Sequence, residues 1–320
     1  MPTELSLVVP MYNEQEVLGT FFDAVLPIME RIGLSFEIVC VNDGSSDGTL
    51  EALRQFRQRD ERIKIVDLSR NFGKESALSA GIDHAVGRGV IPMDADLQDP
   101  PEMVVDLVAK WQEGYEMVLA VRQDRSSDTA FKRFTANTFY RVIGRMSDVE
   151  IPPNAGDFRL MDRKVIDALA LLPERSRFMK GMFAWLGFRQ AVVYYARCPR
   201  AAGESKWKYW KLWNFALEGI VSFTSAPLKV WSYFGFVTAA LGIVYMFYII
   251  AKTMLFGVDV PGYASLIVVI LFFNGLTMIG LGVLGEYLSR IFNEVKQRPV
   301  YLVRERMGLE EPQSASEPEN

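Results

Sequence analysis

Short apolar runs alternate with amphipathic stretches along the first 200 residues of the chain. Turn residues bound five such runs, at 5–10, 36–41, 63–68, 89–93 and 116–121. Between these runs, apolar positions at helical spacing predict helices near 14–31, 48–60, 74–86 and 101–113. We therefore expect an α/β fold with a mostly parallel sheet and helices on its faces, because consecutive parallel strands need crossover connections.

The pattern changes after residue 231, where two stretches are apolar without a polar face. Residues 232–251 and 260–285 contain no charged side chain. Each residue of a helix rises about 1.5 Å, so about 20 apolar residues cross the hydrocarbon layer of a membrane. Two buried helices of a soluble core are the alternative, but core helices seldom run so long without a polar face. We expect two transmembrane helices within 232–290.

Basic residues flank these two stretches but are scarce in the connector between them, which carries only Lys252. Lys229 and a cluster at 206–211 precede the first stretch. The basic residues that follow the second stretch are Arg290, Lys296, Arg298, Arg304 and Arg306. The positive-inside rule then places the N-terminal domain and both termini in the cytoplasm. Residues 291–320 are expected to form a cytosolic tail, disordered over its acidic last dozen residues.

Two further stretches have the composition of a membrane interface. Four of the six tryptophans lie between 207 and 231, interleaved with lysines, as is typical of the headgroup level. Near 130–146, Arg133, Asn137, Arg141 and Arg145 recur at helical spacing beside an apolar stripe. A basic helix lying on an anionic membrane and a helix packed on the domain core both fit this second pattern. These features divide the chain into a domain at 1–205, an interfacial region at 206–231, the membrane helices and the tail.

Composition excludes several classes of function. The net charge of −4 gives no reason to expect a nucleic-acid partner, which favours a strongly basic domain. Two cysteines and one histidine supply neither a disulfide framework nor a zinc site. Cys40 lies in an apolar run and is expected in the core, and His84 is expected to be structural or exposed. The N-terminus lacks the positive region and the long apolar stretch of a signal peptide.

Polar residues cluster directly after four of the five predicted strands. The motifs are PMYNE at 10–14, NDGSSDGT at 42–49, MDADLQDP at 93–100 and RQDR at 122–125. In open α/β sheets ligands bind beyond the carboxyl ends of the strands, so we expect a site at this edge. Asp47 has the position of a helix cap, whereas Asp43 sits at the tip of the strand itself.

Asp94 and Asp96 are two residues apart, which on an extended backbone places both side chains on one face. A hard divalent cation with oxygen ligands, Mg²⁺ or Mn²⁺, would relieve their repulsion. Gln98 has the same parity and could add a carbonyl oxygen. Because Mg²⁺ keeps few protein ligands and is usually shared with substrate phosphates, the expected ligand is a diphosphate.

Taken together, the motifs VVPMYNE, VNDGSSDGT, MDADLQDP, AGDFRLMD and RAAGESKW resemble the family-2 glycosyltransferases of the GT-A fold. More narrowly, the chain is similar to the polyprenyl-phosphate glycosyltransferases, which include dolichyl-phosphate mannose synthases and, as the nearest branch, bactoprenol glucosyltransferases. The resemblance covers nearly the whole chain. It extends to the segment GEYLSRIFNEVKQRPVYLV at 285–303, which is typical of the bactoprenol branch.

The resemblance implies a role for each matching residue. The positions that hold the nucleotide base and ribose are Pro10, Tyr12, Glu14 and Asp43. The metal motif consists of Asp94, Asp96 and Gln98. Arg200 and Lys206, in an R-x-x-G-x-S-K pattern, match residues that reach the donor diphosphate, and Asp157 matches an Asp placed next to the acceptor. Candidates for binding the acceptor phosphate are Arg122, Arg125, Lys132, Arg133 and Ser205.

The implied reaction is the inverting transfer of one sugar from a nucleotide sugar, with UDP-glucose expected, to polyprenyl (undecaprenyl) phosphate at the inner cell membrane. The Q-x-x-R-W motif of processive synthases is absent, which favours a single transfer. Mannose, N-acetylglucosamine and 4-amino-arabinose remain alternative sugars. A non-catalytic module that recognises lipid-linked sugars is the alternative from another class, and its expected mark is loss of the acidic metal motif.

Two points remain open at this level. In the resembling family the residue matching Asp157 is usually described as a general base, but a phosphate monoester has a second pKa of about 6 and scarcely needs deprotonation. Asp157 could instead orient a sugar hydroxyl or stabilise positive charge at the anomeric carbon. Glycines 275, 280 and 285 recur every five residues rather than every four, so association with a second copy is a hypothesis only.

Overall fold

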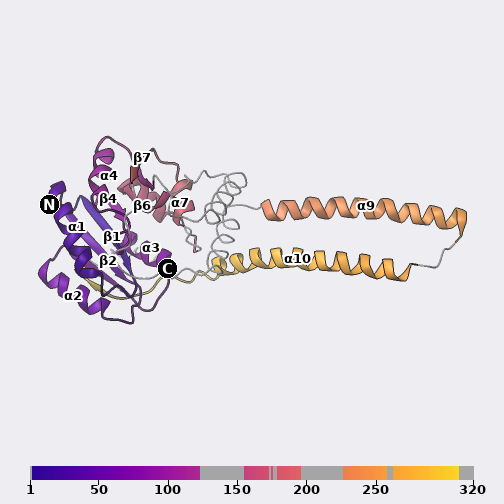
Figure 1. Ribbon diagram of the computed structural model, residues 1–320, viewed down its shortest axis with the longest axis horizontal. Helices are drawn as coiled ribbons and strands as arrows, with labels where there is room; N and C mark the ends of the chain where they lie inside the picture. Colours follow the sequence, from indigo (N-terminus) through magenta and orange to yellow (C-terminus); the bar gives the residue numbers. More distant parts are fainter. Residues whose placement is uncertain are drawn as a thin grey trace, which may run out of the picture.

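The computed structural model describes residues 2–122, 155–172, 174–175, 179–195, 226–257 and 262–309. An α/β domain lies at one end of the molecule, and two long helices extend away from it side by side (Figure 1). The predictions for residues 123–154 and 196–225 concern segments outside the described residues. These segments include the amphipathic stretch near 130–146 and most of the interfacial region.

The described strands form one sheet in the order β7-β5-β6-β4-β1-β2-β3-β8. Parallel pairing joins β1 to β2 and β4, β2 to β3, and β5 to β7, so the mostly parallel sheet is confirmed. β6 runs antiparallel between β4 and β5, and β8 runs antiparallel to β3. The strands are β1 Leu5–Met11, β2 Phe36–Asn42, β3 Ile63–Leu68, β4 Gly89–Pro92, β5 Met117–Arg122, β6 Ala155–Asp162, β7 Gln190–Tyr195 and β8 Val303–Met307.

Helices cover both faces of this sheet. They are α1 Leu18–Ile32, α2 Thr49–Arg59, α3 Lys74–His84, α4 Met103–Gln112, α6 Arg163–Ala170 and α7 Met179–Trp185. Buried side chains of α1, α2 and α4 share one core with Leu5, Leu7 and Val9 of β1. Those of α3, α6 and α7 share the other core with Val8, because successive side chains of a strand point to opposite faces.

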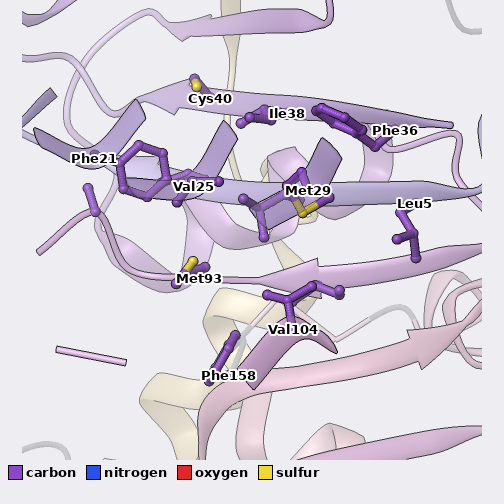
Figure 2. Packing of buried hydrophobic residues seen from close by; sticks show 14 of the residues in the cluster. Leu5, Phe21, Val25, Met29, Phe36, Ile38, Cys40, Met93, Val104 and Phe158 are labelled. Carbon is purple, nitrogen blue, oxygen red and sulfur yellow. The ribbon is translucent and has the colours of Figure 1, made fainter. Parts of the chain in front are cut away.

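The first of these cores is built on α1. Figure 2 shows Phe21, Val25 and Met29, which lie at helical spacing, facing the side chains of Ile38 and Cys40 on β2. Cys40 is fully buried, which confirms its expected place in the core. This packing fixes α1 and β2 relative to each other, and with them the loops that leave β1 and β2 at the carboxyl edge of the sheet.

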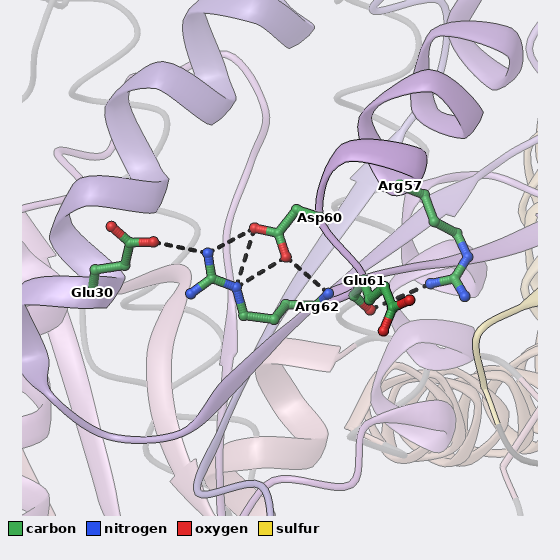
Figure 3. Close-up of polar contacts among 5 residues, drawn as sticks. All are labelled: Glu30, Arg57, Asp60, Glu61 and Arg62. Carbon is green, nitrogen blue, oxygen red and sulfur yellow. Dashed lines mark hydrogen bonds and ion pairs between the residues drawn. The ribbon is translucent and has the colours of Figure 1, made fainter.

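Charged residues at the opposite, amino edge of the sheet have structural partners. Arg62, in the turn before β3, donates from Nη2 to Asp60 at 2.7 Å and to Glu30 of α1 at 2.8 Å (Figure 3). Arg57 of α2 donates to the carbonyl oxygen of Ile63 at 2.7 Å. These contacts bind α1, α2 and the start of β3 together, on the side of the sheet away from the polar strand tips.

The segment that follows the second long helix returns to the domain as β8 and covers the outer edge of β3. Tyr301 donates its hydroxyl to Asp83 at 2.8 Å, and Arg54 of α2 pairs with Glu305 at 2.8 Å. Arg306 donates to Nε2 of His84 at 2.9 Å, so His84 is a half-buried structural residue. Within the predicted tail, residues 291–295 therefore continue α10 and residues 303–307 form a strand of the sheet.

Two helices form the remainder of the described chain, α9 at Ala226–Phe256 and α10 at Tyr263–Val295. Within the described residues, the stretch Trp231–Phe256 is long and apolar enough to cross a membrane. The second predicted span, 260–285, overlaps α10 from Tyr263 onward, and Trp231–Phe256 is the one candidate span that the described residues contain. The indole of Trp231 packs directly on Gly280, where an added Cβ would lie 2.0 Å from Nε1, so the two helices contact each other closely.

Helix α3 contacts β1 through Gly81, which gives a first test of the packing. A methyl group at Gly81 would lie 2.2 Å from Cγ1 of Val8, a stiff and fully buried side chain. We expect Gly81→Ala to lower the free energy of unfolding by about 1–3 kcal/mol through overpacking. Gly19→Ala is the matched control, because no atom lies within 4 Å of that added Cβ on the exposed face of α1. Urea denaturation in detergent measures both, and equal losses would contradict the close contact.

Candidate active site

A pocket with about 220 Å³ of open space lies at the carboxyl edge of the sheet. Met93 and Phe158 contribute apolar walls. Its charged lining consists of Lys74, Asp94, Asp99 and Asp157. The polar strand tips therefore lead to a site at the edge that the sequence predicted.

Strand direction brings the acidic residues together. Asp94 and Asp99 follow β4, whose carboxyl end lies at this edge. Asp157 is near the beginning of β6, which starts at the same edge because it runs antiparallel to β4 and β5. The partly buried carboxylate of Asp157 thus faces that of Asp94 across the pocket, with Lys74 between them.

Lys74 is the first residue of α3 and contacts carboxylates from two other elements. Its ammonium lies 2.7 Å from Oδ1 and 2.8 Å from Oδ2 of Asp94, and 3.2 Å from Oδ2 of Asp157. Burial opposes the charge of Lys74, but the carboxylates of Asp94 and Asp157 outweigh it and raise the pKa of Lys74. Burial raises the pKa of Asp94, and Lys74 opposes that rise. The three side chains form one coupled charge cluster.

Asp94 and Asp96 are both partly exposed, and Ala95 between them is buried. The backbone turns at Ala95 and Asp96 instead of continuing as the expected extended strand, and Leu97 adopts a φ of +56°. The backbone N–H of Gln98 donates to Asp96 at 3.2 Å. The extended backbone from which one shared face of Asp94 and Asp96 was predicted is therefore absent, although both side chains stay partly exposed.

This donor set fits a hard divalent cation that keeps much of its coordination from water and phosphate. Two carboxylates are the usual protein contribution to such a Mg²⁺ or Mn²⁺ site. Among the residues that the structure describes, no group of three or more His, Cys, Asp or Glu side chains could hold a metal ion by itself. A cation at Asp94 would also have to share that carboxylate with Lys74.

Asp43 is buried at the tip of β2 and binds the loop that precedes α3. Its two carboxylate oxygens accept the backbone N–H groups of Phe72 at 2.7 Å and Gly73 at 2.9 Å. Burial raises the pKa of Asp43, while these two N–H groups and the charge of Arg70 act in the opposite direction. Gly44 has a φ of +62°, and a Cβ there would lie 2.4 Å from the backbone of Arg70. The contact between these two loops therefore requires glycine.

The loops after β1 and β2 are bonded to each other. Ser46 donates its backbone N–H to the side chain of Asn13 at 2.8 Å, and Glu14 donates its N–H to the hydroxyl of Thr49 at 2.9 Å. Asp47 accepts the N–H of Thr49, the first residue of α2, at 3.0 Å, but the N-cap position itself belongs to Gly48, one residue later than predicted. Of the predicted nucleotide residues, Pro10 lines the pocket and Tyr12 is exposed on this rim.

Arg122, at the end of β5, lies at the acidic edge and is already paired. Its Nε donates to the hydroxyl of Tyr195 at 3.1 Å, and its Nη2 lies 3.5 Å from Asp99. Burial, together with the nearby Asp99, raises the pKa of Tyr195 to about 12. The other predicted phosphate-binding residues lie outside the described residues: Arg125, Lys132, Arg133, Arg200, Ser205 and Lys206.

Arg159 fixes the backbone beside Asp157. It is buried against the ring of Phe183 at 4.4 Å and donates to the carbonyl oxygen of Gly156 at 2.6 Å. Burial lowers the pKa of Arg159 to about 10, although Asp157 and Glu75 act in the opposite direction. A buried guanidinium thus supports the start of β6, where the acidic side chain enters the site.

Lys74 was not predicted as a site residue, and no role was predicted for Asp99. The available signal was the segment SRNFGKE at 69–75, which follows the third strand as the other polar motifs follow theirs. A lysine at the start of a helix is common on protein surfaces, and nothing in the local sequence indicates its two acidic partners.

Two family models match the chain. Glycosyl transferase family 2 matches residues 6–170, and the GtrB C-terminal hairpin matches residues 226–291. A glycosyltransferase of Synechocystis, named as uncharacterized, is 58% identical over 97% of this chain and 98% of the relative. A prophage-derived bactoprenol glucosyl transferase of Shigella flexneri is 48% identical over 94% of this chain and 97% of the relative.

Among solved structures, the chain is similar to a mannosyl-3-phosphoglycerate synthase of Rubrobacter xylanophilus. The TM-score is 0.49 at 16% identity, covering 68% of this chain and 71% of that one. The family is assigned from the sequence matches, which span both the domain and the helical hairpin.

The double contact of Asp43 can be tested by Asp43→Asn. An amide can accept only through its oxygen, so its NH₂ group would face one of the two backbone N–H groups. We expect a loss of about 1–3 kcal/mol in stability, because a buried donor is left unsatisfied. Hydrogen exchange at residues 70–74 should become faster. Asp23→Asn on the exposed face of α1 is the control, and identical exchange in both variants would contradict the role of Asp43.

Proposed function

The chain belongs to glycosyl transferase family 2, and we propose that it transfers one glucosyl residue from UDP-glucose to polyprenyl phosphate at the cytoplasmic face of a cell membrane. The observation that carries the proposal is the acidic edge of the sheet, where Asp94 and Asp157 come from different elements and face one pocket. The same chain also contains the helical hairpin of α9 and α10. The bactoprenol glucosyl transferase relative, similar along nearly the whole chain, supports the glucosyl donor and the lipid acceptor.

In the proposed reaction, an oxygen of the lipid phosphate forms a bond to the anomeric carbon. The bond from that carbon to the UDP oxygen breaks, and UDP leaves with the electron pair. Attack opposite the leaving group inverts the anomeric carbon, so an α-linked donor gives a β-linked lipid phosphate sugar. The main barrier is the negative charge that builds on the departing diphosphate.

Asp94 and Asp96 are proposed to hold Mg²⁺ or Mn²⁺, with Gln98 as a further oxygen donor. When bound, the cation supplies positive charge to the leaving diphosphate. Arg200 and Lys206 would add charge to the same group. The nucleotide would lie along the rim of the two bonded loops, near Pro10, Tyr12, Glu14 and Asp43. Both oxygens of Asp43 already accept backbone N–H groups. We therefore propose that Asp43 either accepts a hydrogen bond from the nucleotide base through the remaining lone pairs of these oxygens or fixes the shape of the loop that contacts the base.

Asp157 is proposed to act beside the acceptor and the anomeric carbon. A lipid phosphate is mostly dianionic at neutral pH, so orientation of a sugar hydroxyl or stabilisation of positive charge suits Asp157 better than proton abstraction. The acceptor phosphate would be bound by basic residues that follow β5, with Ser205 as a hydroxyl donor. Its candidates are Arg122, Arg125, Lys132 and Arg133.

The domain division and the membrane topology belong to the same proposal. Residues 1–205 together with β8 form the catalytic domain, 206–231 lie at the interface, 232–290 cross the membrane as two helices, and 291–320, which include β8, are cytosolic. The length of α9 and α10 and their exposed apolar side chains support two crossings. The contact between Trp231 and Gly280 supports a hairpin within one chain.

The activity is tested by measuring UDP released from UDP-glucose by the full chain in detergent. We expect release only when polyprenyl phosphate and Mg²⁺ or Mn²⁺ are both present. Asp157→Asn should lower kcat by about 10²–10³-fold, as removal of one stabilising group at a reacting centre usually does. Asp167→Asn, on the exposed face of α6, is the control and should leave kcat unchanged. Undiminished turnover in Asp157→Asn would exclude a direct role for that residue.

The topology is tested by cysteine labelling in intact bacterial cells. In a Cys198→Ser background, Asp259→Cys should react with a membrane-impermeant maleimide, because the connector between the helices lies outside. Ser314→Cys should react only after the cells are opened, and the buried Cys40 should not react in either case. Labelling of position 314 in intact cells would contradict the cytoplasmic placement of the C-terminus.

A further inference from the structure

Lys74 is a cation bound to both oxygens of a carboxylate that the proposed mechanism assigns to a metal ion. Its ammonium is 2.7 Å and 2.8 Å from the two oxygens of Asp94 and reaches Asp157 at 3.2 Å. A divalent cation that coordinates Asp94 therefore binds a carboxylate whose two oxygens both already contact Lys74, and it competes with the ammonium for that charge. Like-charge repulsion between the cation and the ammonium then favours Asp157 as the remaining partner of Lys74.

Contacts at the start and in the body of α3 fix the position of Lys74. The residue before it, Gly73, has a φ of +99°, donates its N–H to Asp43 and accepts the N–H of Ala77 at 3.0 Å. Further along α3, Gly81 packs against Val8 of β1. Lys74 therefore enters the pocket from a helix whose start and body are both anchored, unlike a lysine on a mobile surface.

The charges around the pocket indicate what Lys74 does there. The carboxylates of Asp94, Asp99 and Asp157 face the cationic side chains of Lys74 and Arg122. Without Lys74, three carboxylates would share one cation, and their repulsion would push Asp94 and Asp157 apart. With a divalent cation present as well, the positive charges of the cation, Lys74 and Arg122 balance the carboxylates of this edge, Asp96 included, so the edge no longer repels an anionic diphosphate.

We propose that Lys74 is a positioning residue that occupies Asp94 in the absence of a divalent cation and moves its contact to Asp157 when the cation binds. This inference rests on the metal site of the proposed function. Lys74 thereby weakens binding of the cation alone and favours its binding together with the nucleoside diphosphate, whose negative charge offsets the ammonium. After the exchange, the Lys74 contact holds the Asp157 carboxylate directed into the pocket.

The first experiment measures Mn²⁺ binding to the full chain without nucleotide, from the electron paramagnetic resonance signal of free Mn²⁺. Lys74→Gln should tighten Mn²⁺ binding by about tenfold or more, because a unit positive charge next to Asp94 is removed. Lys74→Arg keeps the charge and should bind Mn²⁺ as the unaltered chain does. Lys110→Gln is the matched control, since Lys110 is also paired with a carboxylate and is 42% exposed, compared with 43% for Lys74. Unchanged or weaker Mn²⁺ binding in Lys74→Gln overturns the proposal.

A second measurement uses the unaltered chain and does not depend on the folding of a variant. Acetylation of individual lysines is followed by mass spectrometry as Mn²⁺ is added. Lys74 should be acetylated faster once Mn²⁺ displaces it from Asp94, while the rate at Lys110 stays constant. A constant or falling rate at Lys74 overturns the proposal. Neither measurement contains a sugar donor or a lipid, so both are independent of whether the UDP-release assay supports lipid glucosylation.

Discussion

Carboxylates gathered at the carboxyl edge of the sheet are the constraint on which the rest of the site depends. Asp94 and Asp157 approach a common point, and partial burial makes the repulsion between them costly. Their closeness is tolerable because Lys74 stands between them, and because Arg122 and Tyr195 bind the neighbouring Asp99. The side chains that balance this edge come from α3, β5 and β7. The charge balance is thus a property of the assembled domain.

The direction of β6 decides where Asp157 lies. In a parallel sheet, a residue near the beginning of a strand would lie at the opposite edge from the residues that follow β4. β6 is inserted antiparallel between β4 and β5, with Ala155 opposite Val121 and Asp162 opposite Gly89. This single reversal puts the start of β6 beside the end of β4. Arg159 then secures that start by binding the carbonyl oxygen of Gly156.

The sequence was sufficient for features that depend on local patterns. The runs from 5–10 to 116–121 predict β1 to β5 closely, because buried strands need continuous apolar residues. Asp94 and the strand-tip motifs are likewise visible as polar residues directly after such runs. Helix α1 begins at Leu18, later than the apolar spacing suggested, because the backbone before it bonds to the loop after β2.

Features that depend on distant partners could not be predicted in this way. Lys74 and Asp157 are 83 positions apart in the sequence, and nothing near either residue specifies the other. The pairing of β8 with β3 joins segments more than 200 residues apart, and β8 has the exposed, charged pattern of an edge strand instead of an apolar run. The dual contact of Asp43 with backbone N–H groups also requires the loop after β3 to be in place.

The same long-range pairing constrains how the domain is attached to its helices. The chain leaves the sheet after β7, passes through α9 and α10, and returns as β8, and these two strands are the opposite edges of the sheet. Glu294, near the end of α10, accepts the backbone N–H of Arg175, which adds a contact between the hairpin and the domain. A domain joined to its hairpin through both edges has less rotational freedom than one joined through a single linker.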